Sequence, residues 1–197
     1  DVRCFKLPMT GEHNALNALG AIAVANHLGI SLDVIKKSLG NFRGVKRRFS
    51  LVGKINGVTL IDDYAHHPVE IEAVLKAARQ FTKGRVLVVH QPHRYSRLSL
   101  LFDEFCRCFN EADIVGITDI YGANETPIAG ASQVALVDGL RLHGHRDVTA
   151  ITGEDGLKEF FMQKTQIEDV LLCLGAGSIS NWVNNLYLKL KTNGKNS

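Results

Sequence analysis

Short apolar segments rich in Val, Ile and Leu alternate with longer amphipathic segments over most of this chain. The apolar segments are expected to be strands and cover residues 58–64, 85–91, 113–118, 147–151 and 169–177. The segments that follow them have the apolar spacing of helices and cover residues 71–81, 98–109, 133–142, 153–164 and 179–191. Strands that are apolar on both faces need helices on both sides. The alternation therefore predicts a three-layer α/β fold, with a doubly wound, mostly parallel, Rossmann-like sheet between two layers of helices.

Two helices are expected before this pattern begins. One starts near Glu12 and stops at Gly29, and a shorter one has Ser31 as its N-cap and ends at Gly40. The next stretch, NFRGVKRRF, contains glycine and basic residues and reads as a linker. We therefore divide the chain into two expected domains, residues 1–44 and 45–197. Because the chain opens at Asp1 in an expected strand, VRCFKLP, we expect a fragment of a longer protein.

Composition excludes several classes of protein. The formal net charge is only +3, and the longest basic run, Lys46-Arg47-Arg48, is short. On charge alone this run is interpreted as an exposed loop, so no nucleic-acid partner is expected. No apolar run approaches the roughly 18 residues of a membrane span, so no membrane partner is expected either. The four cysteines form neither a CxxC pair nor a zinc pattern, which indicates a reducing compartment without disulfides.

Polar clusters follow several of the expected strands. They are DDYAHHP at residues 62–68, HQPHRYSR at 90–97, the loop GITDIYGANETPIAG at 116–130 and LGAGS at 174–178. In open parallel sheets, ligands bind outside the carboxyl ends of the strands. We therefore expect these clusters to meet at one rim of the sheet and to form the functional site.

The cluster HQPHRYSR predicts an anion site. Arg94 and Arg97 share a face if the segment begins a helix, and His93 adds a third possible donor. Guanidinium groups near a helix N-terminus suit a carboxylate or a phosphate. The alternative is that both arginines pair with acids across the sheet.

The cluster DDYAHHP supplies acceptors instead. A carboxylate at a strand end is able to hold sugar hydroxyls or a metal ion, or to cap the next helix. His66 and His67 are adjacent and point in different directions, so a two-histidine metal site is not expected. In the helix that begins near Glu12, Asn14 and Asn17 are three residues apart and are able to present amides to the edge of a base.

Four of these stretches together resemble the Mur ligases of peptidoglycan synthesis. They are GEHNALNALGA, GVKRRF, LIDDYAHHPVEIEAVLKAAR and QPHRYSR, and the resemblance covers essentially the whole chain. The chain is most similar to the branch of the family that joins L-alanine to UDP-N-acetylmuramate. The family has three domains, and the resemblance implies that this chain holds the helical end of the central ATPase domain and the complete C-terminal, amino-acid-binding domain.

The resemblance implies an ATP-dependent ligase reaction through an acyl phosphate, with Mg²⁺ bound mostly by the central domain outside this chain. The implied partners of the chain are ATP, L-alanine, UDP-N-acetylmuramate and the missing N-terminal and central domains. The implied location is the bacterial cytoplasm, and the oligomeric state stays open. The implied ATP-binding residues are His13, Asn14, Asn17, Arg48 and Asp63, of which Arg48 and Asp63 are also the catalytic candidates. The implied amino-acid-binding residues are Tyr64, His66, His93, Arg94 and Arg97. No metal ligand is assigned in this chain.

The chain departs from the family pattern at three points. It has no GxxxxGK[ST] phosphate loop, so the chain alone is expected to be inactive. Asn124 stands where a glycine is usual and Ser178 where an aspartate is common, which leaves the backbone around Glu125 and the role of LGAGS open. Two alternatives remain: a relative in the family that attaches a preformed tripeptide during murein recycling, and a non-catalytic module that binds a dinucleotide through LGAGS.

Overall fold

The computed structural model describes residues 4–9, 11–42 and 44–193. The chain divides into two compact units, Asp1–Lys46 and Arg47–Ser197. This division falls two residues after the domain boundary that we expected from the linker.

The first unit is a pair of helices, α1 (Glu12–His27) and α2 (Leu32–Asn41). Gly29 follows α1 with a positive φ of 79°, which glycine adopts without steric cost, and this confirms the expected stop. Ser31 holds the N-cap position of α2 as expected, although its side chain makes no capping hydrogen bond. Residues 4–7 have no regular secondary structure, so the expected opening strand is wrong over the part of it that the structure describes.

Apolar side chains of this unit are exposed on both helices. Leu16, Leu19 and Leu28 are each at least 60% exposed. Among the described residues of the unit, only Asn14 and Ile35 are buried. Two helices with so little buried surface gain little from the hydrophobic effect by themselves.

The second unit contains a six-stranded sheet with the strand order β1-β2-β6-β3-β4-β5. The strands are β1 (Ser50–Ile55), β2 (Val58–Asp63), β3 (Val86–His90), β4 (Ile114–Thr118), β5 (Val148–Ile151) and β6 (Val170–Leu174). All neighbouring pairs are parallel except β1 with β2. The doubly wound, mostly parallel sheet predicted from the alternation is thus confirmed.

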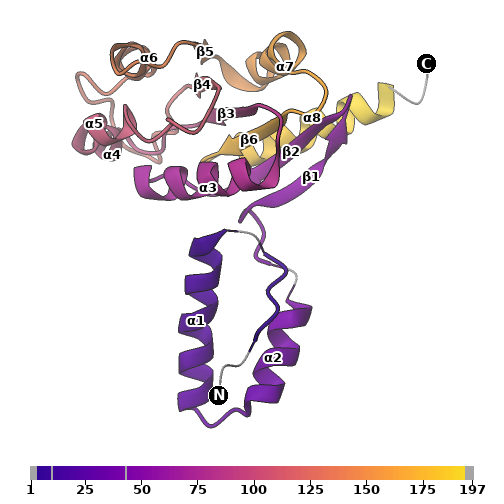
Figure 1. Cartoon of the computed structure of the whole chain (residues 1–197). Coiled ribbons are helices and arrows are strands. Elements are labelled where there is room, and N and C mark those ends of the chain that lie inside the picture. Colours follow the sequence, from indigo (N-terminus) through magenta and orange to yellow (C-terminus); the bar gives the residue numbers. More distant parts are fainter. Residues whose placement is uncertain (1–3, 10, 43, 194–197) are drawn as a thin grey trace. The chain divides into compact units, whose positions relative to one another are not determined.

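Helices cover both faces of this sheet (Figure 1). They are α3 (Pro68–Phe81), α4 (Tyr95–Leu100), α5 (Phe102–Phe105), α6 (Gln133–Leu142), α7 (Gly153–Lys164) and α8 (Ile179–Asn193). Side chains of α3, α5 and α6 share one apolar cluster with alternate residues of the strands. Side chains of α7 and α8 share a second cluster with the other strand residues. The two clusters are the two interfaces of a three-layer α/β/α domain.

The strand β1 was not predicted; it begins directly after the stretch that reads as a linker. It pairs antiparallel with β2 through a tight turn at Asn56-Gly57, where both residues have positive φ. An Asn-Gly pair between two strands is the strongest short-range signal for a hairpin, and it was present in the sequence. The register shifts between Leu51 and Gly53, and the ring of Tyr187 lies over Gly53, where a Cβ atom would meet it at 2.2 Å.

The expected helix over residues 98–109 is also only partly right. Helix α4 begins earlier, at Tyr95, and a break at Leu101 separates it from the single turn of α5. The early start matters because it brings HQPHRYSR to the beginning of a helix. Arg97 lies within α4, whereas Arg94 is the N-cap residue, with a φ of 72°.

Chain direction through the sheet explains where a ligand would bind. From β2 to β5 the connections run over the α3–α6 face, and from β5 the chain returns by α7 to β6, between β2 and β3. The strand β6 then leads into α8 on the opposite face from the helices that follow β2 and β3. Such a reversal opens a crevice at the carboxyl ends of the adjacent strands.

Candidate active site

The rim of the site is formed by the carboxyl ends of β2, β6 and β3. Asp63, Leu174 and His90 are aligned across these three strands, so the loops that follow them leave the sheet at one level. These loops carry DDYAHHP, LGAGS and HQPHRYSR. The structure therefore brings together the clusters that the sequence placed at strand ends.

Asp63 lies inside this rim with its carboxylate occupied by the chain itself. It is 1% exposed, its Oδ2 accepts a hydrogen bond from the backbone N–H of Phe49 at 2.6 Å, and its Oδ1 accepts one from Ala65 at 2.7 Å. The side chain holds the segment before β1 against the loop after β2. The structure thus gives Asp63 an internal structural role beside the predicted contact with ATP.

Arg47 fixes the same segment from the other side, and the sequence did not single it out. Its guanidinium donates to the carbonyl oxygen of Gly175 at 2.5 Å and lies 4.8 Å from the centroid of the Tyr64 ring. Its carbonyl oxygen accepts from the N–H of Tyr64 at 2.8 Å. The basic run is therefore not simply an exposed loop, because Arg47 is half-buried and joins three parts of the rim.

Arg48 remains at the surface beside these groups. Its guanidinium lies 5.8 Å from the centroid of the Tyr64 ring, so Arg47 and Arg48 both contact this tyrosine. It also lies 3.9 Å from Oε1 of Glu70, in an exposed ion pair. Exposed pairs of this kind contribute little to stability, so Arg48 is available to an anionic ligand at low cost.

Glu70 is a second residue that the sequence did not reveal as part of the site. It lies in the first turn of α3, and its Oε2 accepts from the N–H groups of His66 and His67 at 3.0 and 3.2 Å. The same oxygen lies 3.5 Å from Nδ1 of His66. A glutamate three residues after a helix N-cap is the usual signature of a capping box, so the signal was available in HHPVE.

Rings from three loops form a continuous contact along the rim. The Tyr64 and His66 rings meet edge to face at 5.0 Å, and the His66 and His93 rings are 5.8 Å apart. The His93 ring stacks on Tyr121 at 5.4 Å with an interplanar angle of 14°. Tyr121 lies in the loop after β4 and was not predicted as a site residue.

The surroundings of His93 favour its neutral form. Burial lowers its pKa, and the nearby guanidinium groups of Arg97 and Arg94 lower it further. Nη1 of Arg97 lies 3.3 Å from Nδ1 of His93 and donates to the carbonyl oxygen of His93 at 3.1 Å. Arg97 is therefore oriented by the residue four positions before it.

Arg94 is oriented by Glu125, from the loop after β4. The guanidinium lies 3.8 Å from Oε1 of Glu125, whose two oxygens also accept from the hydroxyl and the N–H of Ser96. The bond from the Ser96 hydroxyl is the main reason why the pKa of Glu125 is lowered. Thus one of the two predicted arginines does pair with an acid, but at the surface and beside His93.

The loop that carries Glu125 tolerates the unusual Asn124. Both Ala123 and Asn124 have positive φ, of 50° and 68°. Asparagine adopts the left-handed conformation more readily than other residues with a side chain. Asn124 therefore adopts a conformation that is also open to glycine, and Glu125 reaches Ser96.

The LGAGS turn is packed closely against the rim instead of being open. A Cβ atom at Gly177 would lie 2.6 Å from the Tyr121 ring and 2.5 Å from Oε1 of Gln91. Gln91 also accepts from the N–H of Ile179 and donates to the hydroxyl of Ser178. The glycine thus admits a tyrosine ring, and this leaves no room there for the pyrophosphate of a dinucleotide.

Asp62 faces the opposite side of the sheet from Asp63. Its Oδ2 accepts from the hydroxyl of Ser180 in α8 at 2.5 Å, and burial raises its pKa. Successive residues of a strand point to opposite faces, so only one member of the Asp62-Asp63 pair is able to serve the α3 side of the rim.

The predicted ATP-binding residues of α1 belong to the first unit. Asn14 is buried and Asn17 is exposed, so the two side chains differ in accessibility. The side chain of His13 lies outside the described part of the structure.

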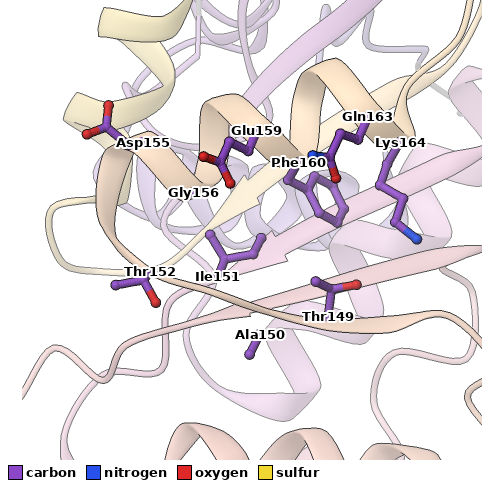
Figure 2. Close-up of a pocket in the computed structure, with 10 residues that line it drawn as sticks. All are labelled: Thr149, Ala150, Ile151, Thr152, Asp155, Gly156, Glu159, Phe160, Gln163 and Lys164. Atoms are coloured by element: carbon purple, nitrogen blue, oxygen red, sulfur yellow. The ribbon is translucent and has the colours of Figure 1, made fainter.

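Other features of the second unit are separate from this rim. A pocket of about 340 Å³ lies between β5 and α7, where Ile151, Gly156 and Phe160 form part of its wall (Figure 2). None of the predicted site residues lines it. Within the described residues, no group of three or more His, Cys, Asp or Glu side chains is placed to hold a metal ion. No described helix is both long and apolar enough to cross a membrane.

Comparison with known proteins adds independent evidence. Residues 47–177 match the family model described as Mur ligase, glutamate ligase domain. A UDP-N-acetylmuramate–L-alanine ligase of Roseobacter denitrificans is 60% identical over 185 residues, which cover 94% of this chain and 40% of that protein. The ligase of the same name from Ruegeria pomeroyi is also 60% identical over 185 residues. The chain thus spans about 40% of the length of these relatives.

Solved structures agree with the sequence comparison. The UDP-N-acetylmuramate–alanine ligase MurC of Thermotoga maritima has a TM-score of 0.78 and 29% identity, over 96% of this chain and 40% of that one. A murein peptide ligase of Psychrobacter arcticus has a TM-score of 0.70 at 23% identity, over 94% of this chain and 38% of that one, and it shares the fold. The family match, the identity to these relatives and the shared fold lead to one conclusion: this chain belongs to the Mur ligase family.

Proposed function

We propose that this chain is the C-terminal part of an ATP-dependent ligase that joins L-alanine to UDP-N-acetylmuramate in peptidoglycan synthesis. The observation that carries the proposal is the rim itself, where Arg94 and Arg97 flank a neutral His93 beside His66. The 60% identity to ligases of that name supports the choice of substrate.

On this proposal, the rim binds the amino acid. Arg94 and Arg97 hold its carboxylate, and fixing the carboxylate orients the amine for attack on an acyl phosphate. Tyr64 and His66 form the wall near the small side chain and the amine. Because Glu125 and His93 already hold the two guanidinium groups, little ordering of side chains is needed when the substrate binds.

Residues of both expected domains are proposed to contact ATP. Arg48 would contact its phosphates, Asp63 would support the segment that carries Arg48, and His13, Asn14 and Asn17 would lie near the base. Mg²⁺ would be held mostly by residues of the central domain. Positive charge from the arginines would stabilise the phosphorylated intermediate and the leaving phosphate.

The partners proposed are therefore ATP, L-alanine, UDP-N-acetylmuramate and the remaining domains of the same protein, in the bacterial cytoplasm. The exposed leucines of α1 favour such domains, because exposed apolar surface of this kind is normally covered. We propose residues 1–44 as the end of the central domain and residues 45–197 as the C-terminal domain.

Activity assays on two proteins test this proposal. The full-length enzyme that carries this segment should form UDP-N-acetylmuramoyl-L-alanine with stoichiometric release of phosphate from ATP. The 197-residue chain alone should form none, since it has no phosphate-binding loop. Turnover by the isolated chain, or a full-length enzyme that uses a murein tripeptide in preference to L-alanine, would contradict the proposal.

The two alternatives are not favoured. The murein peptide ligase of Psychrobacter arcticus shares only the fold at 23% identity. A dinucleotide-binding module would need an open glycine turn, but the Tyr121 ring and Gln91 cover Gly177. Saturable binding of NAD to the chain, monitored through the fluorescence of Trp182, would favour the dinucleotide-binding module instead.

A further inference from the structure

We infer that His66 is the general base that removes a proton from the amine of the incoming amino acid. The inference rests on the function proposed above and assigns to His66 a chemical step beyond shaping the pocket. It is carried by hydrogen bonds that fix which nitrogen of each rim histidine holds a proton.

The tautomer of His66 is set by its own loop. Nδ1 lies 2.9 Å from the carbonyl oxygen of Tyr64. A carbonyl oxygen only accepts, so Nδ1 carries the proton and, in the neutral ring, Nε2 carries the lone pair. Nε2 has no hydrogen-bond partner among the described residues, and the side chain retains 18% exposure. Its lone pair is therefore available to accept a hydrogen bond from a bound ligand.

The carboxylate of Glu70 completes the arrangement. Its Oε2 lies 3.5 Å from Nδ1 of His66 and accepts from the backbone N–H of the same residue at 3.0 Å. A negative charge behind the ring stabilises the imidazolium that forms when Nε2 takes a proton. The other charged or titratable groups around His66 are Arg48, Tyr64, His90 and His93.

The neighbouring His93 is unsuited to the same task. Nη1 of Arg97 faces its Nδ1 at 3.3 Å, and a guanidinium only donates, so Nδ1 of His93 is the acceptor. Its neutral ring then carries the proton on Nε2, which makes that nitrogen a donor. The two histidines thus have opposite tautomers, with His93 able to donate to the substrate carboxylate and His66 able to accept from the amine.

The step balances as follows. The ammonium group of the amino acid gives one proton to Nε2 of His66, and the freed lone pair attacks the carbonyl carbon of the acyl phosphate. The new C–N bond forms, and the C–O bond to phosphate breaks as the tetrahedral intermediate collapses. The phosphate leaves with the electron pair and takes the second amine proton, and His66 releases its proton to solvent.

The test uses the full-length enzyme with His66→Gln, and with His66→Asn as a second variant. Formation of the L-alanine product should fall roughly 10²- to 10⁴-fold in kcat, the range for loss of a general base. Hydroxylamine is largely unprotonated at neutral pH and needs no base, so capture of the acyl phosphate as a hydroxamate should stay near wild type. In both variants, product formation should rise with pH as free amine replaces ammonium.

The matched control is His67→Asn, since His67 is adjacent in sequence and asparagine suits its N-cap position. This variant should keep the wild-type rate. Wild-type product formation by His66→Gln would overturn the inference, and so would an equal loss of product and hydroxamate in both His66 variants. A wild-type enzyme that gives no hydroxamate would instead refute the proposed acyl-phosphate ligase.

Discussion

The carboxylate of Asp63 accepts a hydrogen bond from the backbone N–H of Phe49 at 2.6 Å. This contact ties the end of β2 to the segment that carries Arg48. Arg47 and Phe49 both have positive φ, at 60° and 46°, a conformation that costs roughly 1 kcal/mol or more for residues with a side chain. The bond to Asp63 and the bonds of Arg47 hold the segment in this shape.

Replacing Asp63 by Ala should therefore affect both stability and ATP use. Two N–H groups would lose their acceptor, which we expect to lower the free energy of unfolding by about 2 to 4 kcal/mol. The KM for ATP should rise because Arg48 is no longer positioned. Urea unfolding of this chain and steady-state kinetics of the full-length enzyme measure the two effects.

Asp138→Ala is the control for Asp63→Ala, because its side chain is 60% exposed and its ion pair with Arg141 is at the surface. It should change stability by no more than about 0.5 kcal/mol. A raised KM for ATP with unchanged stability of the Asp63 variant would mean that Asp63 acts on the nucleotide directly.

Loss of Arg94 should mainly affect the amino acid. Arg94→Ala should raise the KM for L-alanine by roughly 10- to 100-fold, the value of a hydrogen bond between charged groups, with little change in the KM for ATP. Glu125→Gln should raise the KM for L-alanine less, because this change removes the carboxylate that orients Arg94 but leaves the guanidinium in place. Arg107→Ala, at an exposed position, is the control, and equal changes for both substrates would contradict the assignment of Arg94.

The buried His90 should make the second unit sensitive to acid. Burial lowers its pKa from 6.5 to about 3, so the folded state binds its proton less readily than the unfolded state. The resulting stability is complete above pH 6.5 and is lost as the pH falls toward 3, by up to about 1.4 kcal/mol per pH unit. Urea unfolding of this chain between pH 4.5 and 7.5 should show this slope.

In His90→Leu, the fall in the free energy of unfolding with decreasing pH should be shallower by up to about 1.4 kcal/mol per pH unit. This holds whatever the absolute stability of the variant. Leu142→Gln is the control, since Leu142 is exposed and neither side chain titrates, so the slope should not change. An unchanged slope in His90→Leu would show that other groups dominate acid unfolding.

Gly177 should not tolerate a side chain. Gly177→Ala would place a Cβ atom 2.6 Å from the Tyr121 ring, which stacks on His93, so we expect a loss of about 1 to 3 kcal/mol and a higher KM for L-alanine. Gly20→Ala is the control, because among the described residues no atom beyond its chain neighbours and the nearby backbone of α1 lies within 4 Å of its Cβ position. It should be neutral or stabilising by up to about 1 kcal/mol. Thermal unfolding of each variant checks the pair.

Much of the fold was predictable because it follows from local patterns. The spacing of apolar residues located five of the six strands and placed the helices between them, although the helix after β3 begins earlier than expected. The strand β1 was missed because the basic residues before it read as a linker, while the Asn56-Gly57 turn was overlooked. A hairpin depends on its turn as much as on its strands.

The candidate site was predictable as a set of clusters but not as a set of contacts. Polar residues after apolar strands marked the rim and singled out His93, Arg94 and Arg97 as an anion site. The resemblance to a family then assigned these residues and His66 to the amino acid. Glu70 holds His66 from only four residues away, in a capping box that the sequence displays. Tyr121, which stacks on His93, and Glu125, which pairs with Arg94, come from the loop after β4. No local pattern encodes these two contacts.

The sequence by itself determined the alternation of strands and helices, because periodicity and turn residues act over a few positions. Only the tertiary structure decided that β6 lies between β2 and β3, so that LGAGS, DDYAHHP and HQPHRYSR adjoin one another. It also decided that Asp63 faces α3 while Asp62 faces α8. Strand order and facing depend on pairing and packing between distant segments, whose free energy is shared across the whole sheet.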